Sequence, residues 1–185
     1  VEITLRPVYP IAIRNPEFFE QVNPMWVPYL LKDVFRVADF NGIPFQWPKP
    51  DPVVMDPETR VIAEEQPYIH RLTWWGVEAA RQGKGLDFAC EVGRAIWGDG
   101  LTDWHMPEVL APVVNRAGLD LTAMDGAVAA DPKGYADEVL INQQTQETAG
   151  HWGTPCLVFE GEPFFGQDRL DMAVWRMQQK GLAKR

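Results

Sequence analysis

The sequence contains no serine among its 185 residues, and it holds only two cysteines and three histidines. No serine nucleophile therefore lies within these residues. Cys90 and Cys156 are far apart and form no Cys-x-x-Cys motif, so no disulfide framework is expected and a reducing cytoplasm is the expected compartment. His70, His105 and His151 show no metal-ligand spacing, and no metal site is expected.

Basic residues are also scarce, with 17 Lys and Arg against 26 Asp and Glu, which gives a net charge of -9. Phosphate binding needs a basic footprint, so no nucleic-acid partner is expected. No apolar run approaches the roughly 18 residues that cross a bilayer, and no secretory signal peptide is recognised. The chain is therefore expected to work away from membranes, and its 46% hydrophobic residues suffice for a core.

Hydrophobic periodicity predicts one strand, a long helical block and a final strand-turn-strand-helix unit. Apolar residues alternate over residues 1–8, which is typical of a strand. Five prolines make residues 43–57 an extended loop. Helical spacing predicts helices over residues 16–22, 28–41, 58–83 with a break near Pro67, 86–97, 106–117, 121–130 and 132–150.

The pattern changes after Gly150. Residues 156–159 are a short apolar run, residues 160–163 are turn-forming, and two phenylalanines follow. This order predicts a β-hairpin, and the spacing of residues 167–180 predicts a closing helix.

The tripeptide Gly153-Thr154-Pro155 stands directly before the first hairpin strand. A proline that opens a strand after a tight turn is a candidate cis peptide. The preceding residue would then expose its N–H and C=O to an extended ligand, as an added strand does. The alternative is an ordinary trans proline at the start of a strand.

A second motif, Gly166-Gln167-Asp168-Arg169, opens the last helix. A helix N-terminus offers unpaired N–H groups that hold a carboxylate, and Asp168 beside them can hold an ammonium group. Together they suit the zwitterionic end of a γ-glutamyl peptide. The alternative is that Asp168 is simply an acidic residue in a first helical turn.

The two motifs in tandem resemble those of the 2-hydroxychromene-2-carboxylate isomerases and the kappa-class glutathione transferases. These are DsbA-like members of the thioredoxin superfamily. The similarity extends over nearly the whole chain, and the C-terminal motif is its most specific part. The matching residues are Tyr29, Asp33, Arg36, Ala38, Gly42 to Phe45, Trp47-Pro48, Ala95 to Gly98, Ala117 to Asp120, Gly153 to Pro155, Glu160 to Glu162, and Phe165 to Leu170.

This resemblance implies an α/β, thioredoxin-like fold with a large all-helical insertion. Residues 1–12 and 132–185 would form the thioredoxin-like domain, and residues 13–131 the helical insertion. The first strand and helix of that fold are not found in this sequence. The family's catalytic serine would precede residue 1. Either these elements lie outside the sequence, or the chain is a divergent member without them.

The resemblance also implies a glutathione-dependent isomerase or transferase that acts on a small aromatic substrate, and a homodimer. Glutathione would bind Thr154, Pro155, Gln167 and Asp168, with Trp152, Gly153 and Asn23 beside them. Two other functions stay open. A DsbA-like thiol-disulfide oxidoreductase would need a cysteine at the family's first turn, and a thioredoxin-fold binding module would have lost catalysis. The substrate, and the choice between isomerase and transferase, stay undetermined.

Several other residues have more ordinary predicted roles. Both cysteines are expected to be small buried hydrophobes. His151 either lines the ligand cleft or packs the hinge between helix and sheet. Tyr29 and Trp97 are expected in the helical core. Asp33 and Arg36, three apart on one helix, are expected to form a surface ion pair.

Overall fold

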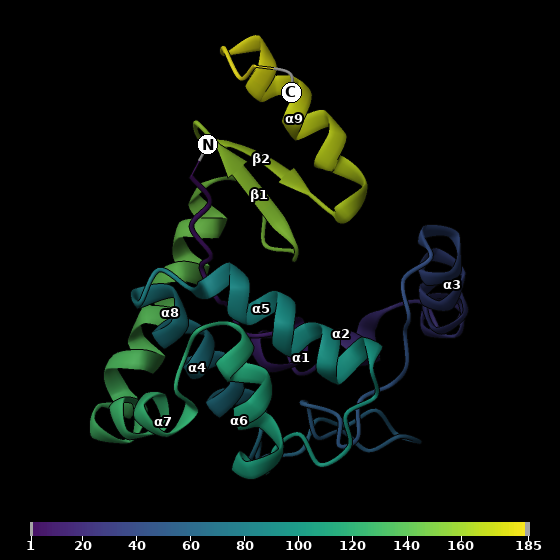
Figure 1. The fold of residues 1–185 in the computed structure, drawn as a ribbon. Helices are drawn as coiled ribbons and strands as arrows, with labels where there is room; N and C mark the ends of the chain where they lie inside the picture. Colours follow the sequence, from purple (N-terminus) through teal and green to yellow (C-terminus); the bar gives the residue numbers. More distant parts are fainter. Residues whose placement is uncertain (1, 184–185) are drawn as a thin grey trace.

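The computed structural model describes residues 2–183, and most of them are helical (Figure 1). One antiparallel two-stranded sheet lies near the C-terminal end, between the helical block and the last helix. The elements in chain order are α1 (Ile11–Arg14), α2 (Phe18–Gln21), α3 (Trp26–Asn41), α4 (Ile69–Arg81), α5 (Gly85–Gly93), the π-helical turn η1 (Arg94–Gly98), α6 (Pro107–Arg116), α7 (Leu121–Ala130), α8 (Pro132–Thr148), β1 (Cys156–Phe159), β2 (Glu162–Phe165), the 3₁₀ turn η2 (Gln167–Arg169) and α9 (Leu170–Gln179).

The main hydrophobic core lies among helices α4 to α8. Trp75, Leu110, Met124 and Val139 come from four of these helices and are almost fully buried, as is Trp104 from the loop before α6. Each side chain of this size stabilises the fold by about 1.5–3 kcal/mol when it is buried. This block is therefore the rigid part of the molecule on which the C-terminal unit is built.

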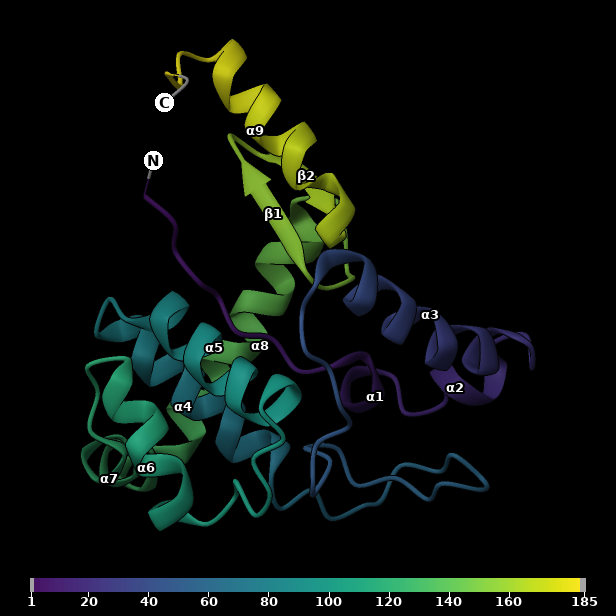
Figure 2. The ribbon, with the colours of Figure 1, turned by 45° about the vertical axis from the view of Figure 1, so that its right-hand side comes forward.

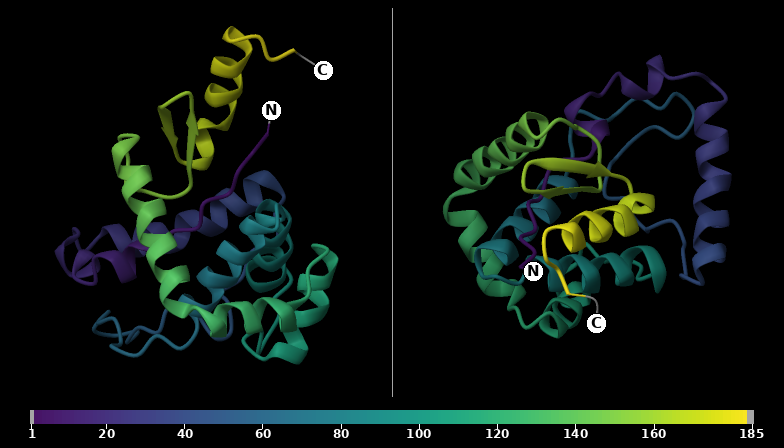
Figure 3. Two further views of the ribbon diagram at one scale, coloured as in Figure 1. Left: turned by 90° about the vertical axis from the view of Figure 1, so that its left-hand side faces the viewer. Right: turned by 90° about the horizontal axis from the view of Figure 1, so that it is seen from above.

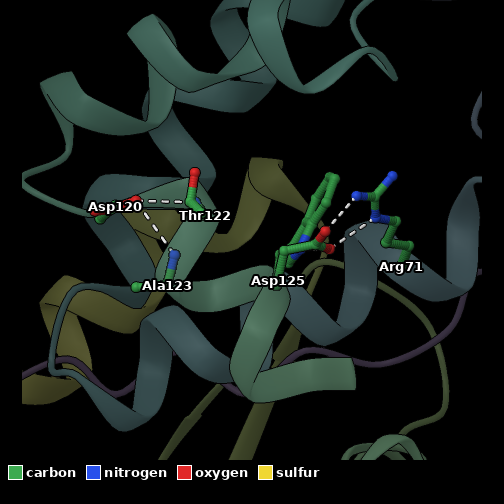
Figure 4. A network of polar contacts seen from close by, with 6 residues as sticks. Arg71, Asp120, Thr122, Ala123 and Asp125 are labelled. Carbon is green, nitrogen blue, oxygen red and sulfur yellow. Dashed lines mark hydrogen bonds and ion pairs between the residues drawn. The ribbon is translucent and has the colours of Figure 1, made fainter. Parts of the chain in front are cut away.

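A polar network fixes α7 within the block (Figure 4). Asp120 caps α7 by accepting the backbone N–H groups of the second and third helical residues, at 2.9 and 3.2 Å. The guanidinium of Arg71, on α4, donates two hydrogen bonds to the carboxylate of Asp125, at 2.9 and 2.6 Å. The Trp75 indole donates to the same carboxylate at 3.2 Å. These hydrogen bonds hold the pKa of Asp125 below its usual value.

The hairpin and the final helix confirm the prediction for the C-terminal region. The strands pair with Cys156 opposite Phe165 and Phe159 opposite Glu162. Glu160 and Gly161 form the connecting turn, and their φ angles of +50° and +82° match the type I′ turn that suits the twist of a hairpin. Helix α9 packs on both strands.

The predicted strand over residues 1–8 is wrong for the described residues 2–8. This segment is extended but pairs with no strand among residues 2–183. It runs instead along the helical block (Figure 3). The Pro7 carbonyl accepts a hydrogen bond from Asn142 at 3.0 Å, and the Tyr9 N–H donates to Gln143 at 3.2 Å. Side chains of α8 thus take the backbone groups that a sheet would have used. Val1 lies outside the described residues.

The predicted helix over residues 58–83 is wrong in its first part. The Asp56 carboxylate accepts the N–H groups of Glu58 and Thr59, which turns the chain so that Met55 bridges to Ile62 as a short antiparallel pair. Helix α4 begins only at Ile69. The other predicted helices are present within a few residues. No helix among residues 2–183 is long and apolar enough to cross a membrane. The division into two domains stays a prediction, although α8 packs against α4.

Candidate functional site

The Gly153–Pro155 turn and the start of the final helix meet at one end of the hairpin. The Thr154–Pro155 peptide bond is cis, as the motif suggested. The Gly166 N–H donates to the Pro155 carbonyl at 2.9 Å, just beyond the paired residues Cys156 and Phe165. Two motifs that are separate in the sequence therefore form one surface.

Side chains from distant segments hold the backbone of this turn. Arg14, at the end of α1, donates to the Trp152 carbonyl at 2.8 Å. The Gly153 N–H donates to Nδ1 of His151 at 2.8 Å, and Nε2 of Gln146 donates to the Gly153 carbonyl at 2.5 Å. Since each of these backbone groups has a partner, the turn is fixed before any ligand arrives.

Thr154 is the exception within this turn. Its N–H donates no hydrogen bond and its C=O accepts none within residues 2–183, and the residue is exposed. The carbonyls on either side of it, of Gly153 and Pro155, are both occupied. An extended ligand backbone could therefore form its pair of hydrogen bonds at Thr154 alone.

A row of aromatic rings packs beside the turn. The His151 ring lies 4.0 Å from the Phe165 ring at an interplanar angle of 17°, and 5.8 Å from the Trp152 ring at 14°. The Trp152 ring continues to Phe18 of α2 at 6.1 Å, and it stays 49% exposed. A Cβ placed on Gly153 would lie only 2.4 Å from the Phe165 ring, so glycine is the residue that fits here.

Charged groups flank the turn on two sides. Burial lowers the pKa of the Arg14 guanidinium, and the negative charge of the nearby Glu147 partly offsets this effect. At the other side Asp168 and Arg169 form an exposed ion pair at 2.6 Å. The Gln167 side chain is exposed, and it makes no side-chain hydrogen bond within the described chain. Both Gln167 and Asp168 are thus exposed, and they directly follow Gly166, whose N–H donates to the Pro155 carbonyl of the turn.

Asn23 is the predicted site residue that the structure places apart from the turn. It lies between α2 and α3, where its Oδ1 accepts the Met25 N–H at 3.0 Å and its carbonyl accepts the Trp26 N–H at 2.8 Å. The Trp26 ring contacts Phe18, which in turn contacts Trp152. Asn23 is therefore joined to the turn through aromatic rings, and no hydrogen bond within residues 2–183 links the two.

Two comparisons with known proteins bear on the family and the fold of this chain. The family model for the DSBA-like thioredoxin domain matches residues 2–178. The chain belongs to the DSBA-like thioredoxin domain family. Among the solved structures that match is a selenomethionine form of 2-hydroxychromene-2-carboxylate isomerase. The likeness has a TM-score of 0.57 at 21% identity, and covers 92% of this chain and 74% of that one. It shows a shared fold. Among curated proteins none matches the chain.

In this DSBA-like chain two predicted positions are corrected. Cys90 is exposed, because α5 buries the face that carries Phe88 and Val92 and Cys90 lies on the other side. Tyr29 is also exposed, since α3 stands apart from the main core. Trp97 does pack against that core, as predicted. The described residues hold no group of three or more His, Cys, Asp or Glu side chains close enough to share a metal ion.

Sequence reasoning missed two residues of the site. Arg14 and Gln146 lie 139 and 7 residues before Gly153 along the chain, and both hold the backbone of the turn. Neither belongs to a recognisable motif. His151 was open to two interpretations, and its ring and Nδ1 both serve the hinge.

Proposed function

We propose that this DSBA-like chain binds glutathione at Thr154 and beside the start of α9, and that it serves a glutathione-dependent isomerase or transferase acting on an aromatic substrate. One observation carries the proposal. The N–H and C=O of Gly153 and the C=O of Pro155 are hydrogen-bonded within the chain, whereas the N–H and C=O of Thr154 have no partner among residues 2–183. The isomerase named among the solved neighbours supports the choice of reaction class.

The arrangement fits the shape and charge of glutathione. The cysteinyl part of the tripeptide is an extended backbone unit, which pairs with Thr154 as a strand does. The γ-glutamyl end carries a carboxylate and an ammonium group. The N–H groups of Gln167 and Asp168, at the start of η2, have no hydrogen-bond partner within residues 2–183 and suit the carboxylate, and the Asp168 side chain suits the ammonium group. Gln167 directly precedes Asp168 in the sequence, and its side chain is exposed.

The protein's part in the reaction would be binding and orientation. When bound, glutathione would supply the thiolate nucleophile for reversible addition to a conjugated carbon of the substrate, with the thiolate expelled again at the end. The turn would hold the backbone of the tripeptide, which would fix the direction of the tripeptide's thiol side chain. The half-exposed Trp152 ring offers a flat apolar surface next to that turn, where the ring of an aromatic substrate can pack.

The test is a calorimetric titration of the intact protein with glutathione. We expect saturable binding, and a Kd at least about tenfold weaker for Asp168→Asn, because a charge-assisted hydrogen bond contributes about 1.5–3 kcal/mol. Asp87→Asn is the matched control. Asp87 also forms an exposed ion pair, with Lys84, but lies on α5. Equal weakening by both variants would show that Asp168 acts only through the overall charge of the protein and not through a contact with glutathione. No binding to the folded protein would refute the glutathione site.

A second candidate is a binding module for extended peptides, because the free groups of Thr154 suit any extended backbone. The α-linked tripeptide Glu-Cys-Gly separates the two functions. It has the same composition as glutathione, but its first residue is joined through the α-carboxyl group. Glutathione should bind more tightly if the γ-glutamyl end is recognised. Equal affinity for the two peptides would favour the binding module.

A further inference from the structure

A small cavity lies in the helical block, away from the proposed glutathione site. It has a volume of about 80 Å³ and opens between the start of α4 and the loop before α6. Figures 1 and 2 show α6 and α7 at one end of the block and the hairpin at the other. The lining residues are Pro67, Tyr68, Arg71, Trp75, Trp104 and His105. None of them belongs to the Gly153–Pro155 turn or to α9, so this cavity is a separate feature.

Aromatic rings form much of the wall of this cavity. The Tyr68 ring meets the Trp104 ring edge-on at 5.9 Å, and it lies 4.9 Å from the His105 ring. The Trp104 indole is almost fully buried and donates a hydrogen bond to the Pro50 carbonyl at 2.7 Å. The proline-rich loop over residues 43–57 thus holds this wall in place, and the rings offer a surface for an apolar group.

The guanidinium of Arg71 is a fixed hydrogen-bond donor at this cavity. Its Nε and Nη2 donate to Asp125, whereas Nη1 has no hydrogen-bond partner within residues 2–183 and points away from that carboxylate (Figure 4). The guanidinium also lies over the Trp75 ring, 4.5 Å from its centroid. Asp125 and Trp75 therefore hold the Arg71 side chain in one orientation, and Nη1 is available to an anion.

His105 supplies a second donor from another segment of the chain. Its Nδ1 is buried and has no hydrogen-bond partner among the described residues. A buried N–H without an acceptor is rare in proteins, so the neutral ring should carry its proton on Nε2. Since Nδ1 is covered, the part of the ring that lines the cavity includes the edge with this N–H group.

We propose that this cavity binds a small organic monocarboxylate. The carboxylate would accept hydrogen bonds from Nη1 of Arg71 and Nε2 of His105, and the apolar part would pack against the Tyr68 ring. Asp125 already offsets the charge of Arg71, so a doubly charged phosphate would bring a negative charge that has no partner here. The volume equals about two to three water molecules, so the cavity takes the carboxylate and the first carbon atoms, and the rest of the ligand lies at its mouth.

The first test is a titration of the intact protein with benzoate, followed by the NMR signals of the tryptophan indole N–H groups. We expect saturable shifts of the Trp75 and Trp104 signals, because both rings line the cavity. Benzamide has nearly the same shape without the charge, and it should bind at least about tenfold more weakly. The proposal is overturned if Trp75 and Trp104 do not shift, or if benzamide or inorganic phosphate binds as tightly as benzoate.

The second test removes one donor and keeps the ring. His105→Phe should weaken benzoate binding at least about tenfold, because the carboxylate loses the Nε2–H group. His70→Phe is the matched control, since His70 lies on α4 outside the cavity lining and packs against Tyr9 at 5.0 Å. Equal benzoate affinity in the wild type and His105→Phe, or equal weakening by the two variants, would contradict the proposal.

Glutathione calorimetry on the same variants separates this cavity from the turn at Thr154. Both His105→Phe and His70→Phe should bind glutathione as the wild type does, because neither residue lies in that turn. Loss of glutathione binding in His105→Phe, with the circular dichroism spectrum unchanged, would show that the two sites are not independent and would overturn the assignment of a separate carboxylate site. The comparison of benzoate with benzamide uses the wild type alone, so it tests the cavity even if a variant folds poorly.

Discussion

The substitution Gly153→Ala tests whether the tight packing behind the turn sets the geometry of the site. A Cβ at this position would lie 2.4 and 2.9 Å from two atoms of the Phe165 ring and 2.9 Å from the His151 ring. All three distances are shorter than any normal contact between carbon atoms. The two rings are stacked at 4.0 Å, so neither can move without breaking the stack or the hydrogen bond from Gly153 to His151.

The expected loss of stability follows from these contacts. Forcing a methyl group into a packed site costs about 1–3 kcal/mol, and the loss of an aromatic stack costs about 0.5–1.5 kcal/mol. Because the Phe165 ring is partly exposed and can swing outward, we expect the two costs to overlap and give about 2 kcal/mol. For a chain of this size that lowers Tm by about 4–8 °C. Glutathione binding should weaken as well, because Thr154 is the next residue.

The assay is urea denaturation followed by circular dichroism, with glutathione calorimetry on the same samples. Gly126→Ala is the control. Gly126 lies within α7 and a Cβ there meets no atom within 4 Å, so alanine should stabilise the protein by up to about 1 kcal/mol. The two substitutions should therefore act in opposite directions. If Gly153→Ala unfolds within about 0.5 kcal/mol of wild type and binds glutathione normally, the rings do not set the turn.

Three further results are expected. His151→Ala should lose about 1–3 kcal/mol in urea denaturation, because it removes both the stacked ring and the partner of the buried Gly153 N–H, whereas His151→Phe should lose less, because it keeps the stack and loses only the hydrogen bond. Hydrogen bonds from Arg71 lower the pKa of Asp125, so this carboxylate stabilises the fold above its unfolded pKa of about 3.9 and the effect is lost as pH falls through the lower folded pKa. Stability measured from about pH 5 to about pH 2 should therefore fall more steeply in the wild type than in Asp125→Asn, and equal slopes would contradict the assignment. Cys90 is exposed and should react rapidly with a chromogenic disulfide, ahead of the half-buried thiol on β1, and Cys90→Ala should remove the rapid phase.

The parts of the fold that were predictable have local causes. The hairpin follows from an apolar run and from the turn at Glu160-Gly161, where Gly161 readily adopts the positive φ angle that the turn needs. Helix α7 begins where Asp120 can cap it, and its predicted bounds agree with the structure. Pairing of the two C-terminal motifs was also predictable, because a hairpin brings the residues before its first strand next to those after its second.

The errors arose where tertiary contacts decide between local alternatives. Residues 2–8 have the alternation of a strand, but a strand needs a neighbour, and here α8 takes the backbone hydrogen bonds instead. In the helix predicted over residues 86–97 apolar residues lie on most sides of the helix, so periodicity could not tell that Phe88 faces the core and Cys90 faces solvent. Burial was decided by the helices that pack on α5.

The hairpin alone would not form the binding site. A two-stranded sheet is only marginally stable by itself, and its turn would sample several conformations. Here Arg14 of α1 and Gln146 of α8 hold the carbonyls of Trp152 and Gly153, the two residues that precede Thr154. The ligand-binding conformation of a local motif is thus fixed by residues outside it. It follows that the motif identifies which backbone groups can bind a ligand, while the helical block determines whether they are held in place to do so.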